Sequence, residues 1–380
     1  MPHSRLEEAI ALMQHFAERT GLTSTRPPRR YLWTDAFAVC NDLGLARLTG
    51  DGRYLERALH LVAQVHHVLG QHRDDEARAG WISGLDDALG EAHPTRGGLR
   101  IGKPLAERGS DDPLNERLEW DRDGQYFHYL TQWMHALDQV ARATRQAHYN
   151  LWARELAQSA FHAFTYARGT APRRMVWKMS IDLSRPQVAA MGQHDPLEGY
   201  LTTVQLRATA ATLHSHDAEP KLDNETTGYA AMLQDRDWAT GDPLGIGGLL
   251  RDAYRVYQLM HLGAEIDETV LPTLLHAALT GLHSYARSGE MQQPAHYRLA
   301  FRELGLAIGL HAVARIPAAS QPEHLDALRQ YLPLREVIET FWRTPAQQQV
   351  ATWLEHQDIN EVMLATSLIP DGFVELFAAD

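Results

Sequence analysis

The 380-residue sequence has one cysteine, Cys40, and no uninterrupted apolar run of the length that a membrane-spanning helix needs. A single cysteine excludes an intrachain disulfide, so Cys40 is expected in the core of a cytoplasmic protein. A membrane span takes about 20 apolar residues, so no membrane partner is expected. Residues 1–21 carry acidic side chains within their apolar pattern, which predicts an amphipathic helix and not a signal peptide.

Positive charge is also scarce, because 36 Lys and Arg stand against 48 Asp and Glu, for a formal net charge of -12. Nucleic acids and anionic membranes favour basic surfaces, so neither is an expected partner. The 21 histidines form no HExxH set, and His66-His67 and His214-Ser215-His216 lack the cysteine partners of common zinc sites. We therefore predict no metal and no cofactor. The sequence does not indicate an oligomeric state.

What the sequence does have is helical periodicity almost throughout, with no sustained strict alternation of apolar and polar residues. The predicted helices are 4–19, 35–48, 52–70, 124–144, 147–168, 196–214, 222–234, 244–262, 267–287, 296–316, 322–342 and 358–368. If these alternate between outer and inner layers, the inner-to-outer turns are mostly short and the outer-to-inner connections are longer.

Two outer-to-inner connections, 71–122 and 169–195, are much longer than the usual loop of a compact domain, and such loops are often functional. All connections of this kind emerge on one face, where the inner helices begin. The expected fold class is all-α, a single (α/α)6 toroid domain over residues 1–380. Residues 71–122 and 169–195 are expected to cover its pocket.

A short motif stands where the first long connection meets the next predicted helix, at Trp120, Asp121, Asp123 and Tyr126. With the helix pattern, it makes the chain resemble the six-hairpin glycosidase-like superfamily. In the unsaturated glucuronyl hydrolase branch, a Trp followed closely by paired Asp opens an inner helix, and here Arg122 interrupts the pair. The resemblance implies a carbohydrate-active enzyme, with a saccharide as its small-molecule partner.

Two polar stripes run along predicted inner helices at the same spacing. They are Gln125, His128, Gln132 and His135 on one helix, and Asp195, Glu198, Thr202 and Gln205 on another. A polar stripe on a buried helix needs a polar partner, a water-filled cavity or a ligand. Glu198 could act there as a general acid of raised pKa. The alternative is a carboxylate stabilised near the helix N-terminus.

Other acids are expected at the same rim. Asp35 lies in the first turn of an inner helix behind Thr34, a candidate cap, and Asp121 and Asp123 are close enough to perturb each other. Asp195 and Asp242 each precede a proline, which is typical of a helix N-cap. For all of these acids, capping or the helix dipole is the structural alternative to ligand contact.

Aromatic and basic residues complete the candidate site. Aromatic rings suited to stacking on a sugar fall in or beside the long connections: Trp33, Trp81, Trp120, Tyr126, Trp177 and Trp238. Lys178 and Asp182, four residues apart beside Trp177, are further ligand candidates, as is His194. A solvated surface is the alternative for the charged residues of this loop.

The leading hypothesis is a glycoside hydrolase in which Asp35, Asp123 and Glu198 supply the catalytic carboxylates. One would protonate the leaving oxygen, and another would activate water or attack the sugar. A second hypothesis is a sugar epimerase or isomerase that uses His128 or His194 as a base. The third is a toroid that binds a saccharide or a protein without catalysis.

Overall fold

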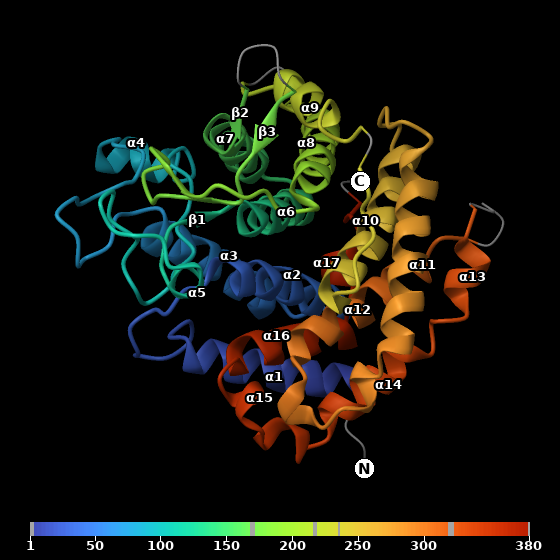
Figure 1. Ribbon diagram of the computed structural model, residues 1–380. Helices are drawn as coiled ribbons and strands as arrows, with labels where there is room; N and C mark the ends of the chain where they lie inside the picture. The colour runs from blue at the N-terminus through green and yellow to red at the C-terminus, as the bar shows by residue number, and fades with distance from the viewer. Residues whose placement is uncertain (1–3, 168–171, 216–218, 235, 318–322, 379–380) are drawn as a thin grey trace. The chain divides into compact units, whose positions relative to one another are not determined.

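The computed structural model describes residues 4–167, 172–215, 219–234, 236–317 and 323–378. The chain is mostly helical and divides into two compact units (Figure 1). Unit 1 comprises Met1–Glu18, Asn41–Tyr54 and Arg236–Phe377, and unit 2 comprises Arg19–Cys40, Leu55–Asp235 and Ala378–Asp380. The expectation of one domain over residues 1–380 stays a prediction.

The α-helices are α1 (Arg5–Arg19), α2 (Leu32–Thr49), α3 (Gly52–Leu69), α4 (Asp87–Ala92), α5 (Glu116–Glu119), α6 (Phe127–Thr144), α7 (Ala147–Phe164), α8 (Asp195–Thr212), α9 (Asp223–Ala230), α10 (Pro243–His261), α11 (Val270–Ser288), α12 (Ala300–Val313), α13 (Leu325–Arg329), α14 (Leu334–Arg343), α15 (Ala351–Leu354), α16 (Gln357–Leu368) and α17 (Asp371–Val374). Short 3-10 helices are η1 (Glu290–Gln292), η2 (Ala295–Tyr297) and η4 (Gln347–Gln349).

Very short strands occur in unit 2. A three-stranded sheet has the order β1 (Gln125–Tyr126), β4 (Lys178–Met179), β5 (Pro186–Val188), and a separate pair joins β2 (Thr165–Tyr166) to β3 (Arg174–Met175). All three pairings are antiparallel. The pairing of β1 with β4 holds the second long segment against the start of α6, which matters for the candidate site.

Unit 2 shows the expected alternation of helix environments. Helices α6 and α8 are buried along most of their length and pack on each other, whereas α3 buries one face. Each buried helix also packs against its following neighbour, α6 with α7 and α8 with α9. A helix buried on most sides must satisfy its polar side chains internally, which makes the α6–α8 contact the natural place to look for a site.

Unit 1 repeats this pattern with α10, α12 and α16 as its buried helices and α11 and α14 as partly exposed ones. Helices α10 and α12 approach very closely. A Cβ added to Gly247 would lie 2.1 Å from the carbonyl oxygen of Gly305, so a side chain there would push the helices apart. The start of α10 follows its sequence signal, since Asp242 accepts a hydrogen bond from the Gly245 amide and Pro243 follows.

Several predicted boundaries need correction. The segment predicted as one helix over 322–342 is two helices, α13 and α14, because Pro333 disfavours helical geometry in the residue before it. Helix α2 begins at Leu32, so Thr34 lies inside the helix and does not cap it. Helix α7 ends at Phe164, and α9 and α12 are shorter than predicted.

Some of the predicted positions cannot be compared with the structure. Residues 1–3, 168–171, 216–218, 318–322 and 379–380 lie outside the described residues, and they include parts of the predicted segments 147–168, 169–195 and 322–342 as well as His216. Among the helices that the structure does describe, none is long and apolar enough to span a membrane. Cys40 is fully buried.

Candidate active site

The two polar stripes meet across the contact between α6 and α8. His128 Nδ1 lies 2.8 and 2.7 Å from the two carboxylate oxygens of Glu198, and Thr131 Oγ1 lies 2.9 Å from Glu198 Oε2. Two turns further along, His135 Nδ1 lies 3.2 Å from the side-chain amide nitrogen of Gln205. The matching spacing of the stripes therefore reflects direct pairing between the two helices at two levels.

The tautomer of His128 follows from its second nitrogen. Trp33 Nε1 lies 3.1 Å from His128 Nε2, and an indole nitrogen can only donate. His128 Nε2 must therefore accept, which leaves the imidazole proton on Nδ1, where it is donated to Glu198. The result is a chain of hydrogen bonds from Trp33 through His128 to Glu198. The His128 side chain is 27% exposed and that of Glu198 9% exposed, so the chain reaches solvent at the histidine.

An aromatic cluster surrounds this chain. Tyr126 stacks on Tyr129 at a centroid distance of 4.6 Å and contacts Trp177 at 4.7 Å. Trp177 in turn stacks on Trp120 at 5.0 Å, and the Trp120 side chain is exposed. Trp33 contacts Tyr129 at 6.4 Å. The structure thus brings together four of the six aromatic residues that the sequence singled out, namely Trp33, Trp120, Tyr126 and Trp177.

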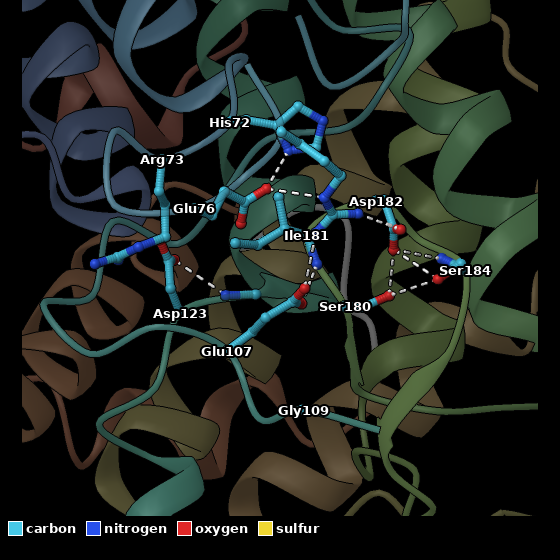
Figure 2. Close-up of polar contacts among 12 residues, drawn as sticks. His72, Arg73, Glu76, Glu107, Gly109, Asp123, Ser180, Ile181, Asp182 and Ser184 are labelled. Carbon is cyan, nitrogen blue, oxygen red and sulfur yellow. Dashed lines mark hydrogen bonds and ion pairs between the residues drawn. The ribbon is translucent and has the colours of Figure 1, made fainter. Parts of the chain in front are cut away.

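Polar contacts join the two long segments to each other, as Figure 2 shows. Glu107, from the first segment, accepts a hydrogen bond of 2.6 Å from the Ile181 amide of the second. Arg78 forms ion pairs with Glu107 and, across the segments, with Asp182. Burial raises the pKa of the Asp182 carboxyl, but hydrogen bonds from Ser184 and Ser180 outweigh it and leave the pKa well below the ordinary value. Asp182 therefore stays ionised in this network.

Asp123 is held by arginine side chains and backbone amides. Its carboxylate contacts Arg100 at 2.6 Å and Arg73 at 3.2 Å, and it accepts backbone hydrogen bonds from Gly102 and Gly124 (Figure 2). The side chain is fully buried. These contacts with two guanidinium groups and several amides anchor the first long segment.

Asp35 is also enclosed. Its side chain is 1% exposed, lies 3.5 Å from the Arg30 guanidinium and accepts a hydrogen bond from the Tyr31 amide. These contacts join the start of α2 to the chain before it. The joint catalytic role expected of Asp35, Asp123 and Glu198 stays a prediction.

Lys178 has a structural environment as well. Its ammonium group is buried and donates to the backbone oxygens of Glu119 and Arg122, and it lies 3.3 Å from the Glu119 carboxylate. Burial lowers the pKa of Lys178, while Glu119 acts in the opposite direction. The Lys178 side chain therefore secures α5 to strand β4, in the same way that Asp182 secures the two long segments.

The remaining predicted residues lie in other surroundings. Asp121 is exposed, and Trp81 is buried against α3 and α4. His194 occupies the position before α8, and Asp195 lies within the helix and accepts a hydrogen bond from the Gly192 amide, so the predicted N-cap position belongs to His194. Trp238 and Asp242 belong to unit 1, where Asp242 caps α10 and pairs with Arg302 at 2.7 Å.

The sequence analysis missed four residues of the cluster. Tyr31 and Tyr129 share a hydrogen bond of 2.6 Å between their hydroxyl groups, and Lys103 Nζ lies 5.2 Å from the centre of the Tyr31 ring. Thr131 is the fourth, through its bond to Glu198. Thr131 could have been found, because it lies three residues after His128 and so on the same helix face. Nothing in the local pattern connects Tyr31 or Lys103 to α6.

Metal ligation has no obvious centre in the described part of the chain, where no three His, Cys, Asp or Glu side chains gather as a metal site would require. The prediction of no metal and no cofactor stays a prediction. The chemistry available from the described cluster is proton transfer by Glu198 and His128, next to aromatic surfaces that can bind an apolar face of a ligand.

Comparison with known proteins gives matches in structure alone. No family model matches the sequence. No curated protein matches it either. Among solved structures, a GH76 alpha-mannanase from Bacteroides thetaiotaomicron matches with a TM-score of 0.54 and 8% identity over 97% of this chain and 96% of that one. A cellobiose 2-epimerase from Spirochaeta thermophila matches with a TM-score of 0.50 and 11% identity over 95% of this chain and 97% of that one.

A sugar epimerase from a ruminal bacterium matches with a TM-score of 0.50 and 10% identity, over 89% of this chain and 87% of that one. This protein has an all-α (α/α)6 toroid fold. The all-α toroid expected from the sequence is thereby confirmed. At 8 to 11% identity the likeness extends to the fold, and the activity must be argued from this chain's own residues.

Proposed function

We propose that this protein is a carbohydrate-active enzyme and that its sugar binds at the aromatic cluster beside His128 and Glu198. The observation that carries the proposal is the hydrogen-bonded chain from Trp33 through His128 to Glu198. A carboxylate and a histidine next to aromatic rings can bind a sugar and move its protons. Structural neighbours of this fold that act on sugars support the proposal.

Glycoside hydrolysis is the first candidate reaction, with Glu198 as the group that transfers a proton to the leaving oxygen. Hydrolysis normally needs a second carboxylate about 5 to 9.5 Å from the first. Asp35 and Asp123 were the predicted partners, and both are engaged by arginine. We assign these two a positioning role. A hydrolase of this chain would draw its second carboxylate from another residue.

Epimerisation or isomerisation is the second candidate, and the contact of His128 with Glu198 favours it. A carboxylate bound to Nδ1 orients an imidazole and stabilises the charge that forms when Nε2 takes a proton, as in other paired acid–base sites. His128 Nε2 is held by Trp33, so a substrate must displace that indole before His128 can act as a base. We propose His128 as the base in preference to His194, because the Nδ1 of His128 is bound to Glu198.

Product analysis separates these candidates. Purified protein is incubated with a panel of glycosides and reducing disaccharides, and products are identified by mass spectrometry and by chromatography against sugar standards. Hydrolysis gives fragments whose summed mass exceeds the substrate by one water, whereas epimerisation leaves the mass unchanged. Saturable binding without any product would favour the non-catalytic alternative. The absence of both binding and turnover would overturn the proposal.

A matched pair of variants ties the activity to the site. Glu198→Gln keeps the size of the side chain and removes its charge, and Glu56→Gln makes the same change at an exposed position of α3. We expect loss of turnover in the first variant and unchanged turnover in the second. Equal activity in both would place the chemistry elsewhere.

A further inference from the structure

Unit 2 contains a cavity of about 450 Å³ that involves none of the residues of the aromatic cluster described above. It lies against α3 and α7 and the segment around α4, and its lining includes Ala63, His66, Trp81, Tyr149 and Trp152. Small-molecule pockets commonly measure about 300 to 1,000 Å³. We infer that this cavity is a second binding site, for a neutral sugar ring. The inference does not depend on the activity proposed for Glu198.

The aromatic side chains that line the cavity are held in place by neighbouring residues. Trp81 is 5% exposed, and its indole lies against two glycines. A Cβ at Gly90 would lie 2.1 Å from Trp81 Cδ1, and one at Gly70 would lie 3.1 Å from Trp81 Cζ3. Larger residues at these positions would displace the ring. Trp152 is fixed by a hydrogen bond of 2.8 Å from its indole nitrogen to the Ala92 carbonyl oxygen.

His66 supplies a hydrogen-bond donor that the described chain leaves unused. Trp133 Nε1 donates to His66 Nε2 at 3.1 Å, so the imidazole proton must be on Nδ1. His66 is 4% exposed, and its Nδ1 makes no hydrogen bond to any described residue. Trp81 Nε1 is likewise without an acceptor among the described residues. Both N–H groups can therefore donate to water or to a ligand in the cavity.

The polar groups of the lining suit the hydroxyl groups of a sugar. A hydroxyl oxygen can accept a hydrogen bond from the His66 or Trp81 N–H group. Aromatic side chains suit the apolar C–H face of a sugar. A plain aromatic hydrocarbon would use the walls and leave the polar atoms unpaired.

Neither His66 nor the carboxylate in the lining attracts an anion. Burial lowers the pKa of His66 to about 3, so its imidazole is neutral near pH 7 and offers no positive charge. The carboxylate in the lining belongs to Glu91, which is exposed and would repel an anion at the cavity's edge. A neutral sugar avoids this repulsion and can still pair with the His66 and Trp81 N–H groups.

Ala63 makes a direct test possible, because it lines the cavity while being exposed on α3, where a larger side chain need not disturb the core. Ala63→Phe should fill the cavity, and Ala63→Ser is the matched control. Binding of methyl glucoside, methyl mannoside and cellobiose is measured by calorimetry on the full chain, in the Glu198→Gln background to prevent turnover. The indole and imidazole N–H resonances of Trp81 and His66 are followed by ¹⁵N NMR.

We expect Ala63→Phe to weaken binding at this site at least tenfold and to lower the number of bound sugars by one, with Ala63→Ser unchanged. The Trp81 and His66 resonances should shift on addition of sugar in the Ala63→Ser protein and should not shift in the Ala63→Phe protein. Identical stoichiometry in Ala63→Phe and Ala63→Ser would overturn the inference, as would binding of indole with no response to any sugar at about 10 mM. Inactivity of the wild-type protein would not change this difference in stoichiometry, so the two proposals fail separately.

Discussion

Two histidines of unit 2 occupy nearly the same arrangement and differ in one partner. His66 and His128 each accept a hydrogen bond of 3.1 Å at Nε2 from a tryptophan indole. Each therefore carries its proton on Nδ1. In His128 that proton meets the Glu198 carboxylate, whereas in His66 it meets no described acceptor.

This comparison separates two uses of the same pair of residue types. A carboxylate behind His128 can stabilise positive charge on the ring once the indole moves away, which suits proton transfer. His66 has no such carboxylate and is buried, so it stays neutral and can serve as a hydrogen-bond donor. The indole fixes the tautomer in both cases, and the group at Nδ1 decides the function.

The largest expected effect comes from removing the partner that distinguishes His128. Glu198→Gln should lower turnover roughly 100- to 10,000-fold, the usual range for loss of a proton-transferring group. The variant should unfold within a few degrees of wild type, because glutamine can still accept from His128. Steady-state kinetics and thermal unfolding measure the two effects. Retained turnover would mean that the pairing with Glu198 is structural.

The second prediction concerns His66 and acid. Its pKa is about 3 in the folded protein and 6.5 as a reference, with burial as the cause. Between pH 3 and pH 6.5 the unfolded chain therefore binds one more proton than the folded chain. The free energy of unfolding decreases as the pH falls from about 6.5 towards 3. The loss approaches at most about 4 to 5 kcal/mol across the whole window.

Urea unfolding at pH 7, 6 and 5 tests this expectation. His66→Gln should flatten the decline relative to wild type, whereas His60→Gln, at a more exposed position on the same helix, should leave it in place. Parallel profiles for wild type and His66→Gln would show that His66 is protonated in the folded state.

The third prediction exchanges the two indoles for rings without a donor. Trp33→Phe removes the hydrogen bond to His128 Nε2 and leaves the ring held at Nδ1 by Glu198, and turnover should change about tenfold because one hydrogen bond is lost. Trp133→Phe should leave turnover unchanged and cost about 1 kcal/mol of stability. Imidazole ¹⁵N shifts report the tautomers directly. His128 should keep its proton on Nδ1 in Trp33→Phe, and unchanged turnover in that variant would contradict the role of the indole.

The smallest effect is expected at Thr131. Thr131→Val keeps the shape of the side chain and removes the hydroxyl near Glu198, which should reduce turnover about two- to tenfold. Thr203→Val is the control, because the Thr203 hydroxyl bonds to the Tyr200 carbonyl oxygen within α8. A larger loss in Thr203→Val than in Thr131→Val would show that general repacking, and not the bond to Glu198, sets the effect.

The sequence was informative wherever the signal was periodic. Helices such as α1 and α10 lie within a residue of their predicted bounds. The shared spacing of the two polar stripes singled out His128 and Glu198, which are in contact in the structure. The split at Pro333 was readable in principle, since proline restricts the residue before it.

The contacts of the long segments could not be predicted in this way. Asp123 meets Arg100 and Arg73, which lie 23 and 50 residues away along a path that has no repeating pattern. Strands as short as β1 and β4 carry too few residues for alternation to show. The sequence pattern around an acidic residue near a helix start is therefore the same in two cases. The residue can contact a ligand, as proposed for Glu198, or an arginine, as Asp123 does.

The bond of Glu107 to Ile181 and the ion pair of Arg78 with Asp182 have a consequence for access to the aromatic cluster. Since Trp120 belongs to the first long segment and Trp177 to the second, these cross-links hold the stacked indoles in register. Neither segment can move away alone without breaking its contacts with the other. Substrate entry and product exit should therefore proceed with one common opening rate, and a single peptide cleavage in either segment should loosen both.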